Sequence, residues 1–198
     1  PTILVGDPKL SPLGYFGGPV QTMHPLIGSP AIDAAGSTNP GGTDARGLPR
    51  FVDGDTASSG AQLDIGAVEA GFALLVTSAI DSNATGTLRS RLTNAAILGE
   101  PCVRIVFDPA VFPASTINLN GNQLTPPAGI PIFIDASNLS APVTISGGGN
   151  SRILNIPATA TLAMHSLRIV GGNAVGASGG GISNAGFCFI MPSTLTGN

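Results

Sequence analysis

Short apolar runs separated by turn residues fill most of the second half of the chain. Each run is rich in β-branched or large apolar side chains and is bounded by Gly, Pro, Asn or Ser, which predicts a β-strand. The expected strands are 103–107, 116–119, 130–134, 143–145, 153–156, 161–164 and 167–170. Alternate side chains of a strand face the same side. The residues predicted to face a common interior are Ile145, Leu154, Ile156, Leu162, Met164, Leu167 and Ile169.

A single segment has helical periodicity instead. Apolar residues recur at helical spacing from Leu88 to Ala96, Thr87 is suited to cap the start, and Gly99 stands where a helix would stop. The pattern predicts one helix over residues 87–98.

A recurring phrase suggests how the strands are arranged. In each copy of the phrase, an apolar residue and one further residue are followed by one to three Gly and then by Asn. The four asparagines are separated by 28, 23 and 25 residues: Asn122, Asn150, Asn173 and Asn198. A period of this length containing several short strands is typical of one coil of a parallel β-solenoid. Gly and Asn are expected to supply left-handed conformations at the corners, and the helix is expected to cap the first coil.

Residues 1–70 differ in texture from residues 71–198. They hold most of the acidic residues and are interrupted throughout by Gly and Pro, which leaves room only for short strands between turns. We therefore expect two units, a turn-rich segment at 1–70 and an all-β solenoid with one capping helix at 71–198.

Composition and charge exclude several classes of function. Only 10% of the 198 residues are charged, the net charge is −3, and no Lys/Arg cluster is present, so neither nucleic acid nor an anionic membrane is an expected partner. No apolar stretch reaches the roughly 18 residues of a membrane span. The sequence has no initial Met and no signal-peptide pattern, so we expect a processed or excerpted piece. Cys102 and Cys188 fit two buried small residues better than a disulfide framework, although a single bridge stays open.

Motifs in both halves point to one family. Those of the second half are Gly86-Thr87-Leu88-Arg89, Ile105-Val106-Phe107-Asp108-Pro109 and Gly179-Gly180-Gly181-Ile182-Ser183-Asn184-Ala185-Gly186. Those of the first half are Gly28-Ser29-Pro30-Ala31-Ile32-Asp33, Thr43-Asp44-Ala45-Arg46-Gly47-Leu48-Pro49-Arg50 and Asp64-Ile65-Gly66-Ala67-Val68-Glu69. The second half resembles the cap and first coils of bacterial extracellular right-handed parallel β-helix proteins, and the first half resembles their choice-of-anchor closing segment.

The order of the two parts departs from the family pattern, because the closing segment here precedes the cap. The resemblance therefore implies a junction with neighbours at both ends. These would be adjacent β-helix modules of a cell-surface protein, or further copies joined head to tail, with Asn198 of one copy meeting residues 1–5 of the next. The expected function is a non-catalytic, extracellular structural or adhesive segment, such as part of an adhesin or a self-assembled fibre.

An acidic turn is the best candidate for a chemical site. Asp53 and Asp55 lie two residues apart, and Asp64 returns to the same region, so the three carboxylates could hold calcium. The alternative is a structural network in which Asp33, Arg46 and Arg50 form ion pairs and carboxylates cap backbone N–H groups. Asn150 and Asn173, as well as Ile145 and Ile169, are expected to have structural roles.

An enzymatic function is not expected. A polysaccharide lyase or hydrolase would need a base with a cationic or metal-bridged partner, but Arg152, His165 and Arg168 have no carboxylate pair nearby in sequence. His24 is expected in a turn. Tyr15 is the clearest aromatic platform for surface glycans. A polysaccharide-processing protein and a calcium-dependent glycan-binding module remain the alternatives.

Overall fold

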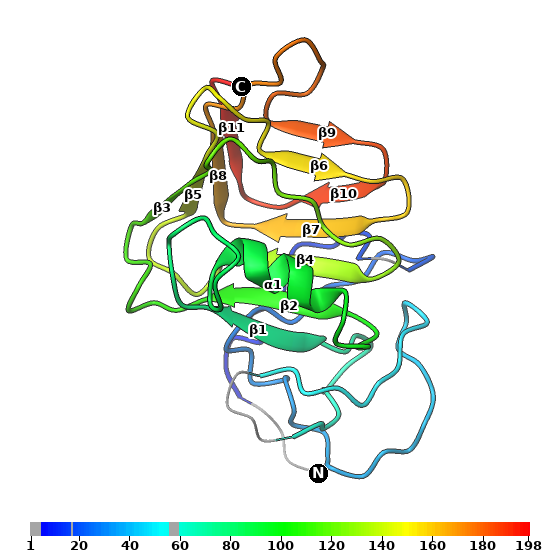
Figure 1. Cartoon of the computed structure of the whole chain (residues 1–198). Helices are drawn as coiled ribbons and strands as arrows, with labels where there is room; N and C mark the ends of the chain where they lie inside the picture. The colour runs from blue at the N-terminus through cyan, green and yellow to red at the C-terminus, as the bar shows by residue number, and fades with distance from the viewer. Residues whose placement is uncertain (1–4, 17, 56–59) are drawn as a thin grey trace.

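The computed structural model describes residues 5–16, 18–55 and 60–198, and it shows a right-handed parallel β-helix of about four turns with one helix (Figure 1). The fold class expected from the sequence is confirmed. The elements are β1 (Phe72–Val76), α1 (Leu88–Ala95), β2 (Val103–Phe107), β3 (Thr116–Asn118), β4 (Pro131–Asp135), β5 (Val143–Ser146), β6 (Leu154–Ile156), β7 (Thr161–His165), β8 (Leu167–Val170), β9 (Ile182–Asn184), β10 (Phe187–Ile190) and β11 (Thr194–Thr196).

The strands form three parallel sheets that enclose one interior. The long sheet has the order β1-β2-β4-β7-β10, the second has β11-β8-β5-β3, and the third pairs β6 with β9. Ile145 pairs with Ile169, 24 positions later, whereas Leu74 pairs with Ile105, 31 positions later. The length of a coil therefore varies around the period that the asparagines indicated, because the loops that connect the three sheets differ in length.

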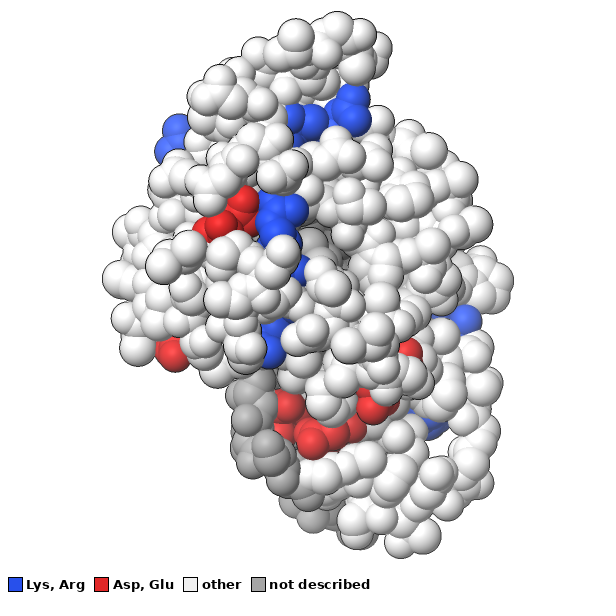
Figure 2. All heavy atoms as spheres, in the orientation of Figure 1, with Lys and Arg blue, Asp and Glu red and all other residues white. Residues whose placement is uncertain are grey.

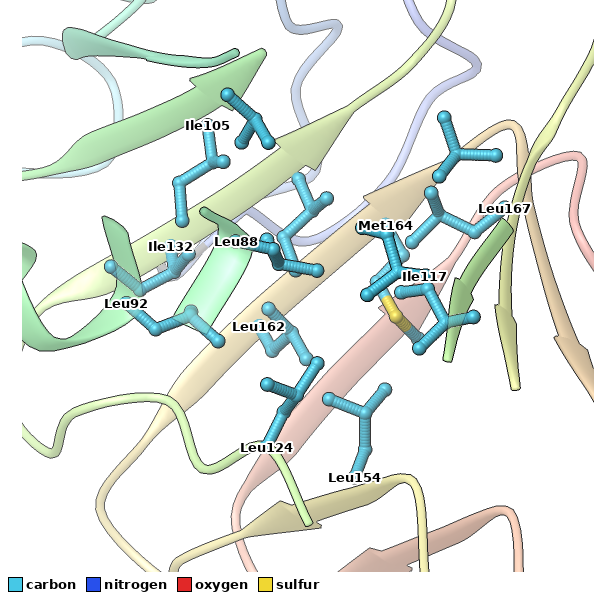
Figure 3. Close-up of a cluster of buried hydrophobic side chains, with 14 of the residues drawn as sticks. Leu88, Leu92, Ile105, Ile117, Leu124, Ile132, Leu154, Leu162, Met164 and Leu167 are labelled. Carbon is cyan, nitrogen blue, oxygen red and sulfur yellow. The ribbon is translucent and has the colours of Figure 1, made fainter. Parts of the chain in front are cut away.

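Apolar side chains from successive coils stack in rows inside the helix (Figure 3). On the second sheet the register aligns Ile117, Ile145, Ile169 and Leu195. The first three are at most 1% exposed. All seven residues that strand alternation predicted to face inward are fully buried, so the predicted interior is confirmed.

Helix α1 begins where the sequence predicts and ends earlier. Thr87 is the N-cap, and its hydroxyl oxygen accepts a hydrogen bond from the N–H of Ser90 at 3.1 Å. Leu88 and Leu92 enter the core of the first coils, as the close-up shows (Figure 3). The helix stops at Ala95 instead of continuing to residue 98, because the apolar face that holds it on the core ends there.

Glycine, and not asparagine, supplies the left-handed backbone conformation near the recurring asparagines. The glycines before these asparagines have positive φ: Gly121, Gly149, Gly171 and Gly197. No described Asn has a positive φ, so that part of the corner prediction was wrong. At the corner between β7 and β8, Ser166 is left-handed, with φ of 57°.

Residues 5–70 contain isolated antiparallel bridges, such as Leu10 with Pro25, and their described part forms no strand. The expectation of short strands there was wrong, because Pro and Gly interrupt every possible ladder. The segment runs below β1 and behind the long sheet in Figure 1, where Phe16 and His24 pack on Phe133. The two expected units thus share a buried contact surface.

Candidate functional site

The last coil leaves the solenoid interior uncovered. In the long sheet the register aligns one row of inward side chains from β1 to β10: Leu74, Ile105, Ile134, Met164 and Ile190. Leu74 is 9% exposed and the middle three are fully buried, whereas Ile190 is 42% exposed. In the second row, Leu195 is 43% exposed. We call the surface formed by β9, β10 and β11 the open end.

The backbone at the open end is also unpaired. β10 is the last strand of the long sheet among the described residues, and the N–H groups of Phe187 and Met191 donate toward β7, to the carbonyls of Ala160 and Met164. In a parallel ladder, alternate residues bond to opposite sides. The backbone groups of Cys188 and Ile190 therefore point away from β7, toward the position of a further strand.

The opposite end, formed by β1 and α1, is blocked, and we call it the closed end. The Arg91 Nε atom donates to the carbonyl of Leu75 at 2.7 Å, and the Thr77 N–H donates to the carbonyl of Gly86 at 2.8 Å. The backbone groups of Leu75, on β1, and of Thr77, just after β1, face away from β2, so these bonds occupy groups that another strand would need. The helix therefore acts as the cap that the sequence predicts.

Residues 5–70 pack on the outer face of the long sheet, where they bond to β2 and β4. Arg104 on β2 is fully buried, and its guanidinium donates to the carbonyls of Pro25 and Gly54. On β4, the Asp135 carboxylate accepts the N–H of Ile27 at 3.0 Å. Burial lowers the pKa of Arg104, and the Asp135 carboxylate opposes that shift. The sequence analysis missed both residues. The signal that could have found them is a charged side chain at an outward-facing position of an otherwise apolar strand, which indicates that another segment covers that face.

The acidic turn differs from the predicted calcium set. Ligand atoms of Asp33, Asp53 and Asp55 lie within 4.8 Å of one another, whereas Asp64 is not part of this group and its carboxylate accepts the N–H groups of Asp33 and Ala70. Burial, together with the neighbouring carboxylates, raises the pKa of Asp33 to about 6, although a hydrogen bond from Gly54 opposes the shift. Calcium binding stays a prediction, with Asp33 in the place given to Asp64.

The two arginines of the expected structural network bind Asp44 and backbone carbonyl groups. Arg46 pairs with Asp44 at 2.7 Å, and Arg50 donates to the backbone carbonyl of Asp64 at 3.1 Å. Glu69, which the sequence did not single out, is buried beside Asp64. Burial raises the pKa of Glu69 to about 7, the Asp64 carboxylate adds to this shift, and backbone hydrogen bonds oppose it.

The histidines lie in different surroundings. His165 is half-buried at the end of β7, and its Nδ1 lies 2.8 Å from the hydroxyl of Ser166, at the predicted corner. Arg168 is exposed on β8. His24, which the sequence predicts in a turn, lies just before the turn at 27–28 and is buried against Phe133, and burial lowers its pKa well below the usual value.

Three further predictions concern the side chains of Tyr15, Cys102 and Cys188. Tyr15 is 42% exposed and packs edge-on against Phe187, with ring centroids 6.3 Å apart. Cys102 and Cys188 are both free, so they form no bridge. Burial raises the pKa of the Cys102 thiol to about 11, which favours the expected role as a buried small residue.

Comparison with known proteins gives no match to a family model, a curated protein or a solved structure. Within the described residues, no helix has the length and apolar character needed to cross a bilayer. The functional argument therefore depends on the two solenoid ends and the surface between them.

Proposed function

We propose that the chain is a non-catalytic structural segment that begins an extended β-solenoid, with further coils stacking on its open end. The observation that carries the proposal is the row from Leu74 to Ile190, which is closed at one end and exposed at the other. A further coil with apolar residues in the same register would bury Ile190 and Leu195 and pair the free edge of β10.

The extracellular setting is part of the proposal and rests on the sequence motifs. They resemble cap, coil and closing segments of bacterial surface β-helix proteins, in which such a rod would hold adhesive surfaces away from the cell. The scarcity of charge is compatible with lateral packing of rods, because like charges would repel one another. The segment at 5–70 would correspond to the closing part of a preceding module packed on the next module's first coils.

The closed end also affects the choice between modules and fibres. Head-to-tail growth needs both ends of a copy to accept a strand, but Arg91 and Gly86 occupy backbone groups of β1. Residues 1–4, which the sequence predicts to meet Asn198 of another copy, lie outside the described residues. The geometry favours association through the open end alone, so isolated chains should pair and stop at two copies.

Light scattering of the purified chain over a concentration range tests this proposal. We expect dimers at high concentration for the natural sequence and monomers for the double variant Ile190→Lys, Leu195→Lys, whose charges block the open end. Ile97→Lys is the matched control, because Ile97 is 79% exposed beside the closed end, and it should leave the dimer intact. Natural chains that stay monomeric would contradict the proposal. Fibres with a repeat of one copy would show that the closed end also accepts a strand.

A further inference from the structure

A polar groove lies at the corner where loops of three successive coils stack. Its volume is about 420 Å³, and six polar residues line it together with small and apolar ones. We call it the amide groove, and its polar residues are Asn122, Gln123, Asn150, Ser151, Arg152 and Asn173. Its size is in the range of small-ligand sites in proteins, which is roughly 300 to 1,000 Å³.

The amide groove offers hydrogen-bonding groups at regular intervals. Asn122, Asn150 and Asn173 belong to successive coils, and strands of neighbouring coils are separated by roughly 4.8 Å. All three side chains are exposed. Asn173 donates to the carbonyl of Gly149 at 2.8 Å, whereas the side chains of Asn122 and Asn150 make no hydrogen bond to any described residue. Each free amide presents one acceptor and two donors.

Arg152 gives the groove a fixed positive charge. Its Nε donates to the carbonyl of Gly179 at 3.0 Å, one terminal nitrogen to Gln123 Oε1 at 3.1 Å, and the other to the carbonyl of Ser178 at 2.7 Å. A guanidinium has five N–H donors, so two remain for a ligand. No carboxylate lines the groove, and charged side chains are sparse on the face seen in Figure 2.

We propose that the amide groove binds a linear anionic glycan that runs along the solenoid axis. The free amides of Asn122 and Asn150 would bond to sugar hydroxyls on consecutive units, and the two remaining donors of Arg152 would pair with a sugar carboxylate. Val175, which is 84% exposed at the groove, would contact the apolar face of a sugar ring. None of the residues that line the groove belongs to β9, β10 or β11, so the proposal does not depend on the structural function proposed above.

Calorimetric titration with an oligomer of galacturonate tests this site, with a glucose oligomer of the same length as the neutral comparator. We expect the uronate to bind at least tenfold more tightly, because hydrogen bonds between a guanidinium and a carboxylate are stronger than those to a neutral hydroxyl. Arg152→Gln should remove this preference. Arg168→Gln, at an exposed site on β8, is the matched control and should leave it unchanged.

A second variant keeps the test independent of how Arg152 supports its loop. Asn150→Ala removes only an exposed amide that bonds no described residue, so the unfolding temperature should stay unchanged while the affinity for the uronate oligomer falls about fivefold. Absence of binding at millimolar uronate would overturn the proposal. Equal losses for Arg152→Gln and Arg168→Gln would also overturn it, because they would indicate attraction to the general charge of the protein.

Discussion

Each end of the solenoid is formed by a parallel strand of the long sheet, but the surroundings of the two strands differ. At the closed end, Leu74 is 9% exposed, and helix α1 supplies Arg91 to the outer edge of β1. At the open end, Ile190 is 42% exposed, and β10 has no neighbour on its outer side among the described residues. This difference leaves the open end as the edge that can accept a further strand.

The strongest way to break this comparison is to destroy the interior that joins the two ends. Ile145→Asp or Ile169→Asp places an unpaired charge in a fully buried row, so we expect loss of cooperative folding. Circular dichroism during heating would measure it. The control Ile145→Val should cost only about 1 kcal/mol. Unchanged thermal unfolding of either Asp variant would show that the assigned register is wrong.

Opening the closed end should have a smaller effect. Arg91→Met removes the bond to the Leu75 carbonyl and leaves an edge acceptor unpaired, so the free energy of unfolding should fall by about 1 to 3 kcal/mol. The edge should also become available for association, which light scattering would detect as species larger than dimers. Arg168→Met is the control, and an equal loss of stability in both variants would contradict a capping role for Arg91.

The pH dependence of stability sharpens the role of residues 5–70 beside the closed end. The pKa of Glu69 is raised in the folded protein to about 7 from an ordinary value of 4.5. The folded state therefore binds more protons between these values, so the contribution of Glu69 is fully present below pH 4.5 and is lost as the pH rises through 7.

Thermal unfolding of Glu69→Gln between pH 4.5 and 8 measures this contribution. Relative to the variant, the natural protein should lose stability as the pH rises. Asp33, with its pKa raised to about 6, contributes with the same sign in both proteins and cancels in the difference. A difference that is constant with pH would mean that Glu69 titrates normally.

The smallest expected effect is a response of the closed end to calcium. The backbone carbonyl of Asp53 accepts the N–H of Ala73 on β1, so an ion held by Asp33, Asp53 and Asp55 would steady this edge. Millimolar calcium should raise the unfolding temperature by about 2 to 4 °C, which corresponds to about 1 kcal/mol for a chain of this size. Asp53→Asn should abolish the rise and Asp7→Asn, at an exposed site, should not. Equal responses to calcium in both variants would exclude the site.

The sequence predicted what depends on local periodicity. The strand at Val103–Phe107, the cap at Thr87 and the buried row through Ile145 follow from alternation, capping chemistry and repeat spacing. Contacts between distant segments were not predictable in this way. Arg104 meets Gly54 and Asp33 joins Asp53 only because residues 5–70 fold back on the long sheet, and neither contact leaves a periodic signal.

The most direct test of the difference between the two ends is hydrogen exchange of individual amides, measured by NMR at a concentration where the protein is monomeric. The account predicts slow exchange at Thr77, whose N–H is bonded to Gly86, and fast exchange at Cys188 and Ile190, whose N–H groups point away from β7. Equal protection of all three amides would contradict it, because the open end would then already be covered.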